Sequence, residues 1–369
     1  MEYRLEELFD LQMGKTPSRS VTEYWESGNN KWISIADLSK CGKYIYDTKE
    51  CLSDIAVSES GIKQIPANTV VMSFKLSIGK TAITSEPMYS NEAIMSFRDR
   101  KLVQLLPEYI YYLLLSKNWD DGTNKAVMGK TLNKATLSKV KVNIHSMQEQ
   151  QELVYVLNQA TALIELHQQQ LQKLDDLVKA RFVELFGDTV LNPFGWEKAL
   201  LSTVCDVRDG THDSPSYYET GYPLVTSKNV SSGKINLTDC SLICESDFKK
   251  INERSKVDTG DIIMPMIGTI GKPVIVDIEP NFAIKNVALI KFKDSSRVLN
   301  AYVRALLMSD YFEDAVLSKV RGGTQKFISL GDIRKLCVLV PPMEKQEQFV
   351  MFVNQVDKSK LLQFFCFPI

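Results

Sequence analysis

Three glycine-containing stretches concentrate the side chains of this sequence that could do chemistry. They are GKTPSR at Gly14–Arg19, DGTHDSPSYY at Asp209–Tyr218 and RGGTQK at Arg321–Lys326. Arginine, lysine, glutamine, serine and threonine donate hydrogen bonds to phosphate oxygens and to base edges, and glycine lets a backbone approach a ligand closely. These residue types therefore suit contact with a nucleic acid better than the breaking of a bond.

The residue spacings that mark common catalytic sites are missing from the sequence. Lys80 and Lys272 each follow Ile-Gly, but neither lies in the Gly-x-x-x-x-Gly-Lys-Ser/Thr loop that cradles nucleotide phosphates. The three histidines and the Cys240/Cys244 pair lack the spacing of metal ligands. We therefore expect no catalytic residue and no metal site in this chain.

Two basic segments supply further candidate contacts. Segment 117–141 has six lysines against two aspartates, and segment 317–336 has five basic residues against one aspartate, whereas 146–188 has seven acidic residues against three basic ones. A formal charge of −1 can therefore conceal two local phosphate-binding surfaces, and a solvated charged face is the alternative for each segment. The predicted DNA contacts are Lys15, Thr16, Ser18, Arg19, Ser34, Lys75, Lys80, Lys125, Lys130, Thr131, Lys134, Arg208, Thr211, His212, Ser214, Tyr217, Ser227, Lys228, Lys272, Arg321, Thr324, Gln325 and Lys326.

An internal repeat of nearly 200 residues defines the elements that must position these side chains. Ala67–Thr84 aligns with Thr259–Val276 at an offset of 192, and Leu137–Ala160 aligns with Ile333–Val356 at an offset of 196. The two basic segments occupy equivalent places in the repeat, whereas the glycine-containing loops differ between the copies. A shared apolar framework with different loops is what we expect of two domains that bind different nucleic-acid sequences.

Each copy should contain short strands, a helix, a basic stretch, another strand and a long helix. Trp32–Ile35 and Val70–Met72 read as strands, with tight turns at Gly79 and Gly271. Short helices are expected at 108–116 and 301–308. The predicted fold class is therefore α+β (mixed α/β), with two pseudo-repeated globular domains joined by long antiparallel coiled-coil helices.

The first long helix is predicted over Met147–Phe186, which has no glycine or proline and stops at Gly187. Its apolar residues recur at 3-4 spacing, so it needs a partner helix, and its own repeat from Met343 is the obvious one. That second helix is expected to be truncated, ending in the apolar tail Leu361–Ile369, so part of the first should stay bare or be covered by another chain. The predicted packing positions are Leu157, Ile164, Leu171, Leu174, Val178, Phe349, Val353 and Val356.

The predicted segments are a first domain at 1–145, a central spacer helix at 146–187, a second domain at 188–341 and a shortened helix with a tail at 342–369. Apolar residues make up 44% of the chain and charged residues 24%, as in ordinary globular proteins. No apolar run reaches the ~18 residues of a membrane span, and no signal peptide is evident. Seven scattered cysteines favour a reducing cytoplasm.

In the order and the duplication of its motifs, the chain resembles the specificity (S) subunit of type I restriction–modification systems. Each motif is weak by itself, but together they cover nearly the whole chain. The matching pieces are Gly14–Arg19 with Trp32–Ile35, Asp209–His212, Gly260–Ile263 with Ile270–Lys272, Gly323–Lys326, Lys173–Gly187 and Pro341–Gln346.

The resemblance implies that each domain is a target recognition domain for one half of a bipartite double-stranded DNA site. The long helices would set the gap between the half-sites and dock DNA adenine methyltransferase (M) subunits, which an endonuclease/translocase (R) subunit would join. This chain would bind no cofactor, because S-adenosylmethionine, ATP and Mg²⁺ would belong to its partners. Self-association through the uncovered helix is a further expectation, and a two-module coiled-coil scaffold without a DNA role is the alternative function.

Overall fold

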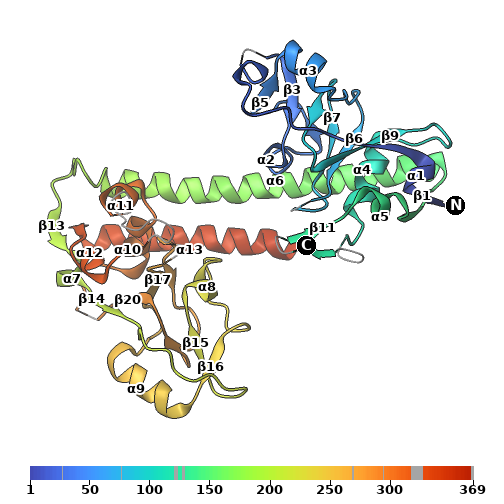
Figure 1. The fold of residues 1–369 in the computed structure, drawn as a ribbon. Coiled ribbons are helices and arrows are strands. Elements are labelled where there is room, and N and C mark those ends of the chain that lie inside the picture. The colour runs from blue at the N-terminus through green and yellow to red at the C-terminus, as the bar shows by residue number, and fades with distance from the viewer. Residues whose placement is uncertain are drawn as a thin grey trace. The chain divides into compact units, whose positions relative to one another are not determined.

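The chain folds into two units that repeat one plan, Met1–Glu165 (unit 1) and Leu166–Ile369 (unit 2). Figure 1 shows the elements of each. The computed structural model describes the whole chain except Ser27, Leu76, 120–123, 127–128, 268–269, Asp294, 317–326, 367–369 and the side chains of 124–126, 129–131 and 363–366. The boundary between the units falls inside the long helix, and the bounds of the four predicted segments stay a prediction.

Unit 1 contains two sheets that carry its loops. The larger has the strand order β2-β9-β6-β7-β4, with β2 at Phe9–Met13, β9 at Ile94–Asp99, β6 at Val70–Ser73, β7 at Thr81–Thr84 and β4 at Tyr44–Ile45. The smaller has the order β5-β3-β8, with β5 at Glu50–Leu52, β3 at Asn30–Ile33 and β8 at Tyr89–Ser90. Strand β3 is antiparallel to β5 and parallel to β8.

Unit 2 repeats the smaller sheet and the first four strands of the larger one, in the same order and with the same strand directions, and β4 has no counterpart among its described strands. Its larger sheet is β14-β20-β17-β18, with β14 at Asp206–Asp209, β20 at Val287–Lys291, β17 at Ile262–Pro265 and β18 at Val274–Ile275. Its smaller sheet is β16-β15-β19, with β16 at Ser241–Ile243, β15 at Tyr222–Val225 and β19 at Ala283–Ile284. Again the central strand β15 pairs antiparallel on one side and parallel on the other. The predicted duplication is therefore confirmed in seven paired strands of the two sheets.

The stretch that the two copies share most clearly forms the centre of each larger sheet. All four residues of β6 are buried, as are all four of β17, because both faces of the sheet are covered. Gly79 and Gly271 follow at φ of 89° and 79°, in the left-handed region that glycine adopts without steric cost. The predicted core strands and tight turns are confirmed.

The remaining elements place the sheets against the helices. In unit 1 they are β1 (Glu2–Arg4), α1 (Leu5–Leu8), η1 (Thr22–Tyr24), α2 (Ile35–Leu38), α3 (Asp54–Ser60), α4 (Pro107–Leu115), β10 (Asn124–Ala126), β11 (Gly129–Thr131), α5 (Lys134–Ser138) and β12 (Lys141–Asn143). In unit 2 they are β13 (Glu197–Leu200), α7 (Leu201–Val204), α8 (Ser227–Val230), α9 (Glu245–Ser255), α10 (Asn300–Leu307), α11 (Asp310–Ala315), α12 (Leu330–Arg334) and β21 (Cys337–Val340). Strand β1 pairs with β12, and its counterpart β13 pairs with β21.

Helix α6 spans Met147–Phe186 and α13 spans Met343–Cys366. In unit 2 they run antiparallel, because Phe349 packs on Phe182 at one end of the contact and Lys360 pairs with Asp175 toward the other. As predicted, α6 ends at Gly187, and α13 is the shorter helix. The predicted apolar tail begins at Leu361, but α13 continues through Cys366. Leucine favours a helix and phenylalanine tolerates one, so an apolar tail does not end it.

Both long helices begin on a buried glutamine that the repeat shares. Gln150 accepts the Leu106 N–H at 3.1 Å, and Gln346 accepts the Leu299 N–H at 2.8 Å, just ahead of α4 and α10. Each amide also donates to two nearby backbone carbonyls. A buried amide with these bonds satisfied fixes one arrangement of its neighbours. Each glutamine thus ties the core of its unit to the long helix that follows.

One prediction of local structure was wrong. The predicted strand Trp32–Ile35 ends at Ile33, because the Ser34 hydroxyl and Asp37 form a capping box that starts α2. Leu157 and Ile164, two of the predicted packing positions, are 38% and 39% exposed, and their packing stays a prediction. Phe182, which was not among the predicted positions, is 5% exposed and packs in the core of unit 2.

Candidate nucleic-acid interface

A lysine–serine contact recurs at the end of a short helix in each unit. Lys80 donates to the hydroxyl of Ser39 at the end of α2, and Lys272 donates to the carbonyl of Ser231 at the end of α8, at 3.4 Å. Both pairs are related by the same offset of 192 residues. The turn after β6 or β17 and the adjacent short helix therefore present one basic group at the same place in each unit.

In these short helices, some side chains cap the helix and others are exposed. Ser34 donates to Asp37 at 2.6 Å, and Thr226 makes the equivalent bond to Asn229 at 2.8 Å. The Ser34 hydroxyl, a predicted DNA contact, is thus used to cap α2. On α8, Ser227 is half-buried and Lys228 is exposed. Lys228 therefore lies on the short helix whose C-terminal end Lys272 contacts.

In unit 1 the loop Gly14–Arg19 is held by acidic and aromatic partners. Arg19 donates to both oxygens of Glu50, at 2.5 and 2.9 Å, and its guanidinium lies 3.6 Å from the centre of the Trp25 ring. This pairing lowers the pKa of Glu50. Thr16 donates to Glu92, and Lys15 donates to the carbonyl of Ser60. A phosphate or base would have to compete with Glu50 for Arg19.

In unit 2 the corresponding loop is organised around the buried carboxylate of Asp209. One oxygen accepts from Arg254, and the other is 2.8 Å from Nε2 of His212. The other ring nitrogen, Nδ1, is 2.8 Å from Asn286. The contacts to Asn286 and Asp209 raise the pKa of His212. Both ring nitrogens of His212 are therefore used to hold the loop.

The other predicted contacts of this loop are less constrained. Ser214 accepts a hydrogen bond from Lys285 at 2.7 Å, and Thr211 accepts the N–H of Asp213 at 3.1 Å. Tyr217 is an exposed aromatic side chain. A tyrosine in this position could stack on a base or hydrogen-bond a phosphate.

Sequence reasoning missed the partners that hold these loops. Glu50, Trp25, Asp209, Arg254 and Asn286 lie in the same two loop regions as the predicted contacts. Arg19 and Glu50 are 31 residues apart, and Asp209 and Arg254 are 45 apart. No local spacing signals such pairs, since only tertiary folding brings them together.

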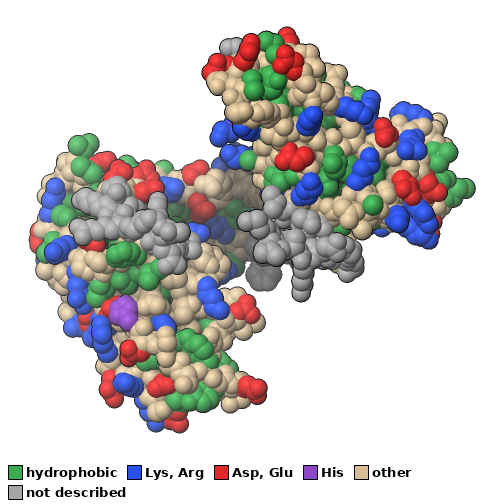
Figure 2. Space-filling model, viewed as in Figure 1, with side chains coloured by type: hydrophobic (Ala, Val, Ile, Leu, Met, Phe, Trp, Pro, Cys, Tyr) green, Lys and Arg blue, Asp and Glu red, His purple; other side chains and the backbone are tan. Residues whose placement is uncertain are grey.

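Some predictions fall where the structure gives no side chain. Among the described residues, Lys75 lies 5.3 Å from the centre of the Phe74 ring, Ser18 shares a hydrogen bond with Ser20 at 2.7 Å, and Lys134 is exposed at the start of α5. The predicted contacts outside the described side chains are Lys125, Lys130, Thr131, Arg321, Thr324, Gln325 and Lys326. Much of the two basic segments is therefore drawn in grey in Figure 2, where basic and acidic side chains intermingle on the visible face of each unit.

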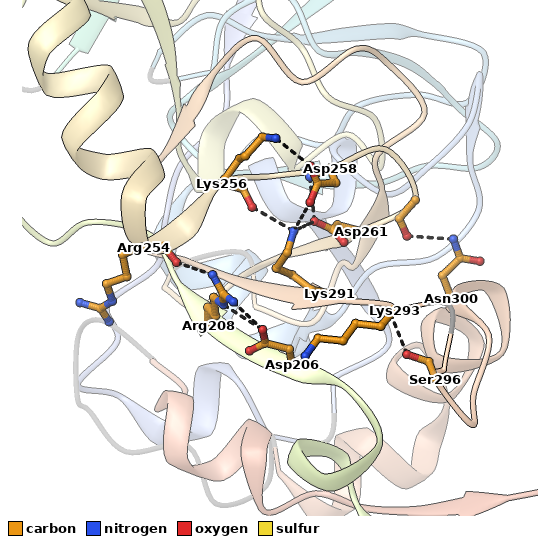
Figure 3. A network of polar contacts seen from close by, with 11 residues as sticks. Asp206, Arg208, Arg254, Lys256, Asp258, Asp261, Lys291, Lys293, Ser296 and Asn300 are labelled. Atoms are coloured by element: carbon orange, nitrogen blue, oxygen red, sulfur yellow. Dashed lines mark hydrogen bonds and ion pairs between the residues drawn. The ribbon is translucent and has the colours of Figure 1, made fainter.

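Below the unit 2 loop, a charged network fixes the ends of β14, β17 and β20 (Figure 3). Lys291 donates to Asp258 at 2.8 Å and to Asp261 at 2.6 Å, and the Asp261 side chain is only 3% exposed. Beside it, Arg208 donates to Asp206 at 2.6 Å and to the Arg254 carbonyl at 2.9 Å. The predicted DNA contact Arg208 therefore also belongs to this network.

The network makes the stability of unit 2 depend on pH. The hydrogen bond from Lys291 lowers the pKa of Asp258, and that from Arg208 lowers the pKa of Asp206. A carboxylate whose pKa is lower in the folded state stabilises the fold above its unfolded value, about 3.9. That contribution disappears as the pH falls through the folded pKa.

Replacing Lys291 with methionine should destabilise unit 2 by about 2–3 kcal/mol at neutral pH, because buried Asp261 loses its counter-ion. The difference from the unsubstituted chain should shrink below about pH 4, where the carboxylates take up protons. Urea unfolding at neutral pH and below about pH 4 measures this difference in the free energy of unfolding. Lys293→Met, an exposed neighbour, should cost less than about 0.5 kcal/mol. An equal effect of the two substitutions would contradict the assigned role of Lys291.

Within the described part of the chain, no three His, Cys, Asp or Glu side chains are grouped so that they could hold a metal ion. The described helices also include none that is both long and apolar enough to cross a membrane. What the structure does present, twice, is a loop-bearing sheet with polar and basic residues at equivalent places, each attached to a long helix. Such an arrangement defines a two-part recognition protein.

Comparison with known proteins supports this class of protein. The family model described as the type I restriction modification DNA specificity domain matches the chain twice, over residues 1–176 and 193–363. The chain therefore belongs to the type I restriction–modification DNA specificity family, as its sequence motifs had indicated. Specificity subunits are recognition components and not enzymes.

Similar proteins carry the same description. The chain is 26% identical to the MjaIX specificity subunit of a type I restriction enzyme of Methanocaldococcus jannaschii, over 95% of this chain and 85% of that protein. It is 24% identical to the MjaVIII specificity subunit of the same organism, over 76% and 68%.

Solved structures show the same fold. The S subunit of a type I restriction–modification system from M. genitalium matches with a TM-score of 0.53 at 13% identity, over 98% of this chain and 90% of that one. A chain from a study of complex assembly and conformational transition in the type I R-M system matches with a TM-score of 0.53 at 17% identity, over 98% and 91%. At these identities the likeness establishes the fold alone.

Proposed function

We propose that this chain reads a bipartite double-stranded DNA sequence, one half with each recognition fold. The observation that carries the proposal is the duplication of the two sheets, β4 excepted, with loops that differ between the copies. Unit 1 holds Arg19 against Glu50, whereas unit 2 holds His212 against Asp209. Two frames with different polar loops suit two different half-sites, since base edges are read by side chains and not by the framework.

The basic residues have a different part in this proposal. Lys80 and Lys272, at equivalent places in the two units, would contact phosphates, as would the lysines of the two basic segments. Phosphate contacts position a protein on the duplex and make its affinity depend on salt. Charge reversal at Lys130 or Lys326 should therefore weaken binding to all sequences, whereas a change of Gln325 should alter the sequence preferred.

The proposal extends to the partners that the family implies. DNA adenine methyltransferase subunits would dock on the helices α6 and α13, and an endonuclease/translocase subunit would join that assembly. S-adenosylmethionine, ATP and Mg²⁺ would be bound by those subunits and none of them by this chain. A cytoplasmic location follows from such partners.

Methylation mapping in cells that express this chain with its methyltransferase tests the function directly. Methylated adenines within one two-part sequence are expected, and they should disappear when this chain is omitted. A gel-shift series with the methyltransferase present gives the independent measurement, and retention should fall steeply with salt. Salt-independent retention, or none, would favour the scaffold without a DNA role.

A further inference from the structure

Lys285 is a buried lysine between the smaller sheet of unit 2 and the loop Asp209–Tyr218. It follows β19 and is 9% exposed, and its Nζ donates to the hydroxyl of Ser214 at 2.7 Å. Its backbone N–H donates to the carbonyl of Val225 at 2.9 Å, and it forms an isolated parallel bridge with Thr211. Both the sheet and the loop therefore hold this residue in place.

The charge of Lys285 is not compensated by the described part of the chain. An ammonium has three N–H donors, and Ser214 accepts one of them. No carboxylate of the described residues pairs with Lys285, whereas Lys291 of the same unit is paired with Asp258 and Asp261. Burying a charge is unfavourable unless an opposite charge lies beside it. Lys285 therefore lacks the partner that Lys291 has.

The carboxylates of the loop are not available to Lys285. The buried carboxylate of Asp209 accepts from Arg254 with one oxygen and lies 2.8 Å from Nε2 of His212 with the other. Asp213 is exposed and forms no ion pair with a described residue. The loop region thus combines three basic side chains with one buried carboxylate, so an anion from outside the chain would balance its charge.

The repeat shows that the framework does not require a lysine at this place. In unit 1 the equivalent residue is Asn91, which follows β8 as Lys285 follows β19. The N–H of Asn91 donates to the carbonyl of Ile33 at 3.1 Å, the same bond that Lys285 makes to Val225. The same backbone arrangement thus forms around an uncharged amide. Lys285 therefore has a role other than building the sheet.

The donor end of Lys285 lies close to the surface. Ser214 is exposed, so the ammonium that it contacts is near the outer side of the loop while the hydrocarbon stem is buried. Because the Ser214 oxygen accepts from Lys285, the Ser214 O–H can donate elsewhere. The pair can thus offer two N–H donors and one O–H donor to a single ligand.

We propose that Lys285 and Ser214 bind a backbone phosphate of the DNA half-site that unit 2 reads. The inference rests on the proposed function and adds a contact, Lys285, that the sequence motifs did not indicate. A phosphate oxygen carries the negative charge that the buried ammonium lacks, whereas the acceptors on a base edge are neutral. Since unit 1 has Asn91 at this place, the contact belongs to one half-site only.

Replacing Lys285 with methionine separates this role from a structural one. Methionine keeps much of the hydrocarbon stem and removes the charge, so the urea midpoint of unfolding should stay the same or rise, because no ion pair is lost. The affinity for DNA should fall about tenfold at ~0.1 M salt, and the slope of log affinity against log salt should become shallower by about one. Gel shifts with the methyltransferase present measure both quantities.

Two further variants complete the experiment. Ser214→Ala, at an exposed position, should keep the fold and lower the affinity about fivefold through the loss of one hydrogen bond. Lys198→Met is the matched control, because Lys198 is exposed on β13 and should change neither affinity nor slope. Unchanged affinity and slope in both Lys285→Met and Ser214→Ala would overturn the proposal, as would a lower urea midpoint of Lys285→Met with unchanged affinity.

Methylation mapping distinguishes a phosphate from a base as the ligand. The Lys285→Met chain should direct methylation to the same two-part sequence at a lower level, because phosphate contacts carry no base information. A change confined to one half of that sequence would make Lys285 a base contact and overturn the phosphate assignment. If the unsubstituted chain itself showed no salt-dependent retention of DNA, the proposed function would be wrong, and this inference with it.

Discussion

Replacing both Lys80 and Lys272 with glutamate should lower the affinity for DNA about a hundredfold at ~0.1 M salt, roughly tenfold for each lysine. Each lysine follows a tight glycine turn and reaches the end of a short helix in its own unit. Neither lysine pairs with a carboxylate of the described residues, so the charge of each is available to a phosphate. The reduction should be similar for all DNA sequences, because phosphate contacts carry no base information.

Gel shifts over a salt series, with the methyltransferase present, measure the effect. The slope of log affinity against log salt should become shallower by about two, one for each phosphate that the double variant no longer binds. Lys198→Glu is the control, because Lys198 is exposed on β13, away from the recognition loops, and should change neither affinity nor slope. Unchanged affinity in the double variant would exclude these lysines from the interface.

Replacing Phe349 with alanine should destabilise unit 2 by about 3–5 kcal/mol. Phe349 is fully buried where α13 meets α6, with its ring centre 5.6 Å from that of Phe182 and 5.5 Å from that of Phe186. Tyr302 stacks on Phe182 at 5.5 Å in the same cluster. The substitution removes apolar packing and also leaves a cavity that the rigid aromatic neighbours cannot fill.

The repeat provides an internal control for this experiment. Leu153 is the counterpart of Phe349 in unit 1, but it is 39% exposed, so Leu153→Ala should cost less than about 1 kcal/mol. Urea unfolding followed by tryptophan fluorescence compares the two variants. Equal decreases in stability would contradict the packing of α13 on α6.

The framework was predictable because its signals are local. A run of apolar residues followed by a glycine identified β6, β17 and their turns. The absence of glycine and proline from 147 to 186 set the bounds of α6. Short-range chemistry also explains the main local error, since the Ser34–Asp37 capping box ended β3 earlier than its apolar run suggested.

The state of the polar loops was not predictable in the same way. Arg19, His212 and Arg208 have the side chains of DNA contacts, but in the folded chain they are bonded to Glu50, Asp209 and Asp206. Two of these pairs are close in sequence, yet even there a carboxylate near a basic residue does not show whether the two meet. How the strands and loops of the sheet bring the two side chains together decides it, and that is a property of the whole fold.

The sequence by itself determined the duplication, the long helix with its apolar stripe and the family of the chain, because repeats, periodicity and motif order can be read from the order of residues along the chain. Only the tertiary structure decided which polar groups are already paired and which part of the stripe is covered. Those two facts depend on contacts such as Arg19 with Glu50 and Phe349 with Phe182, whose partners folding brings together across 31 and 167 residues.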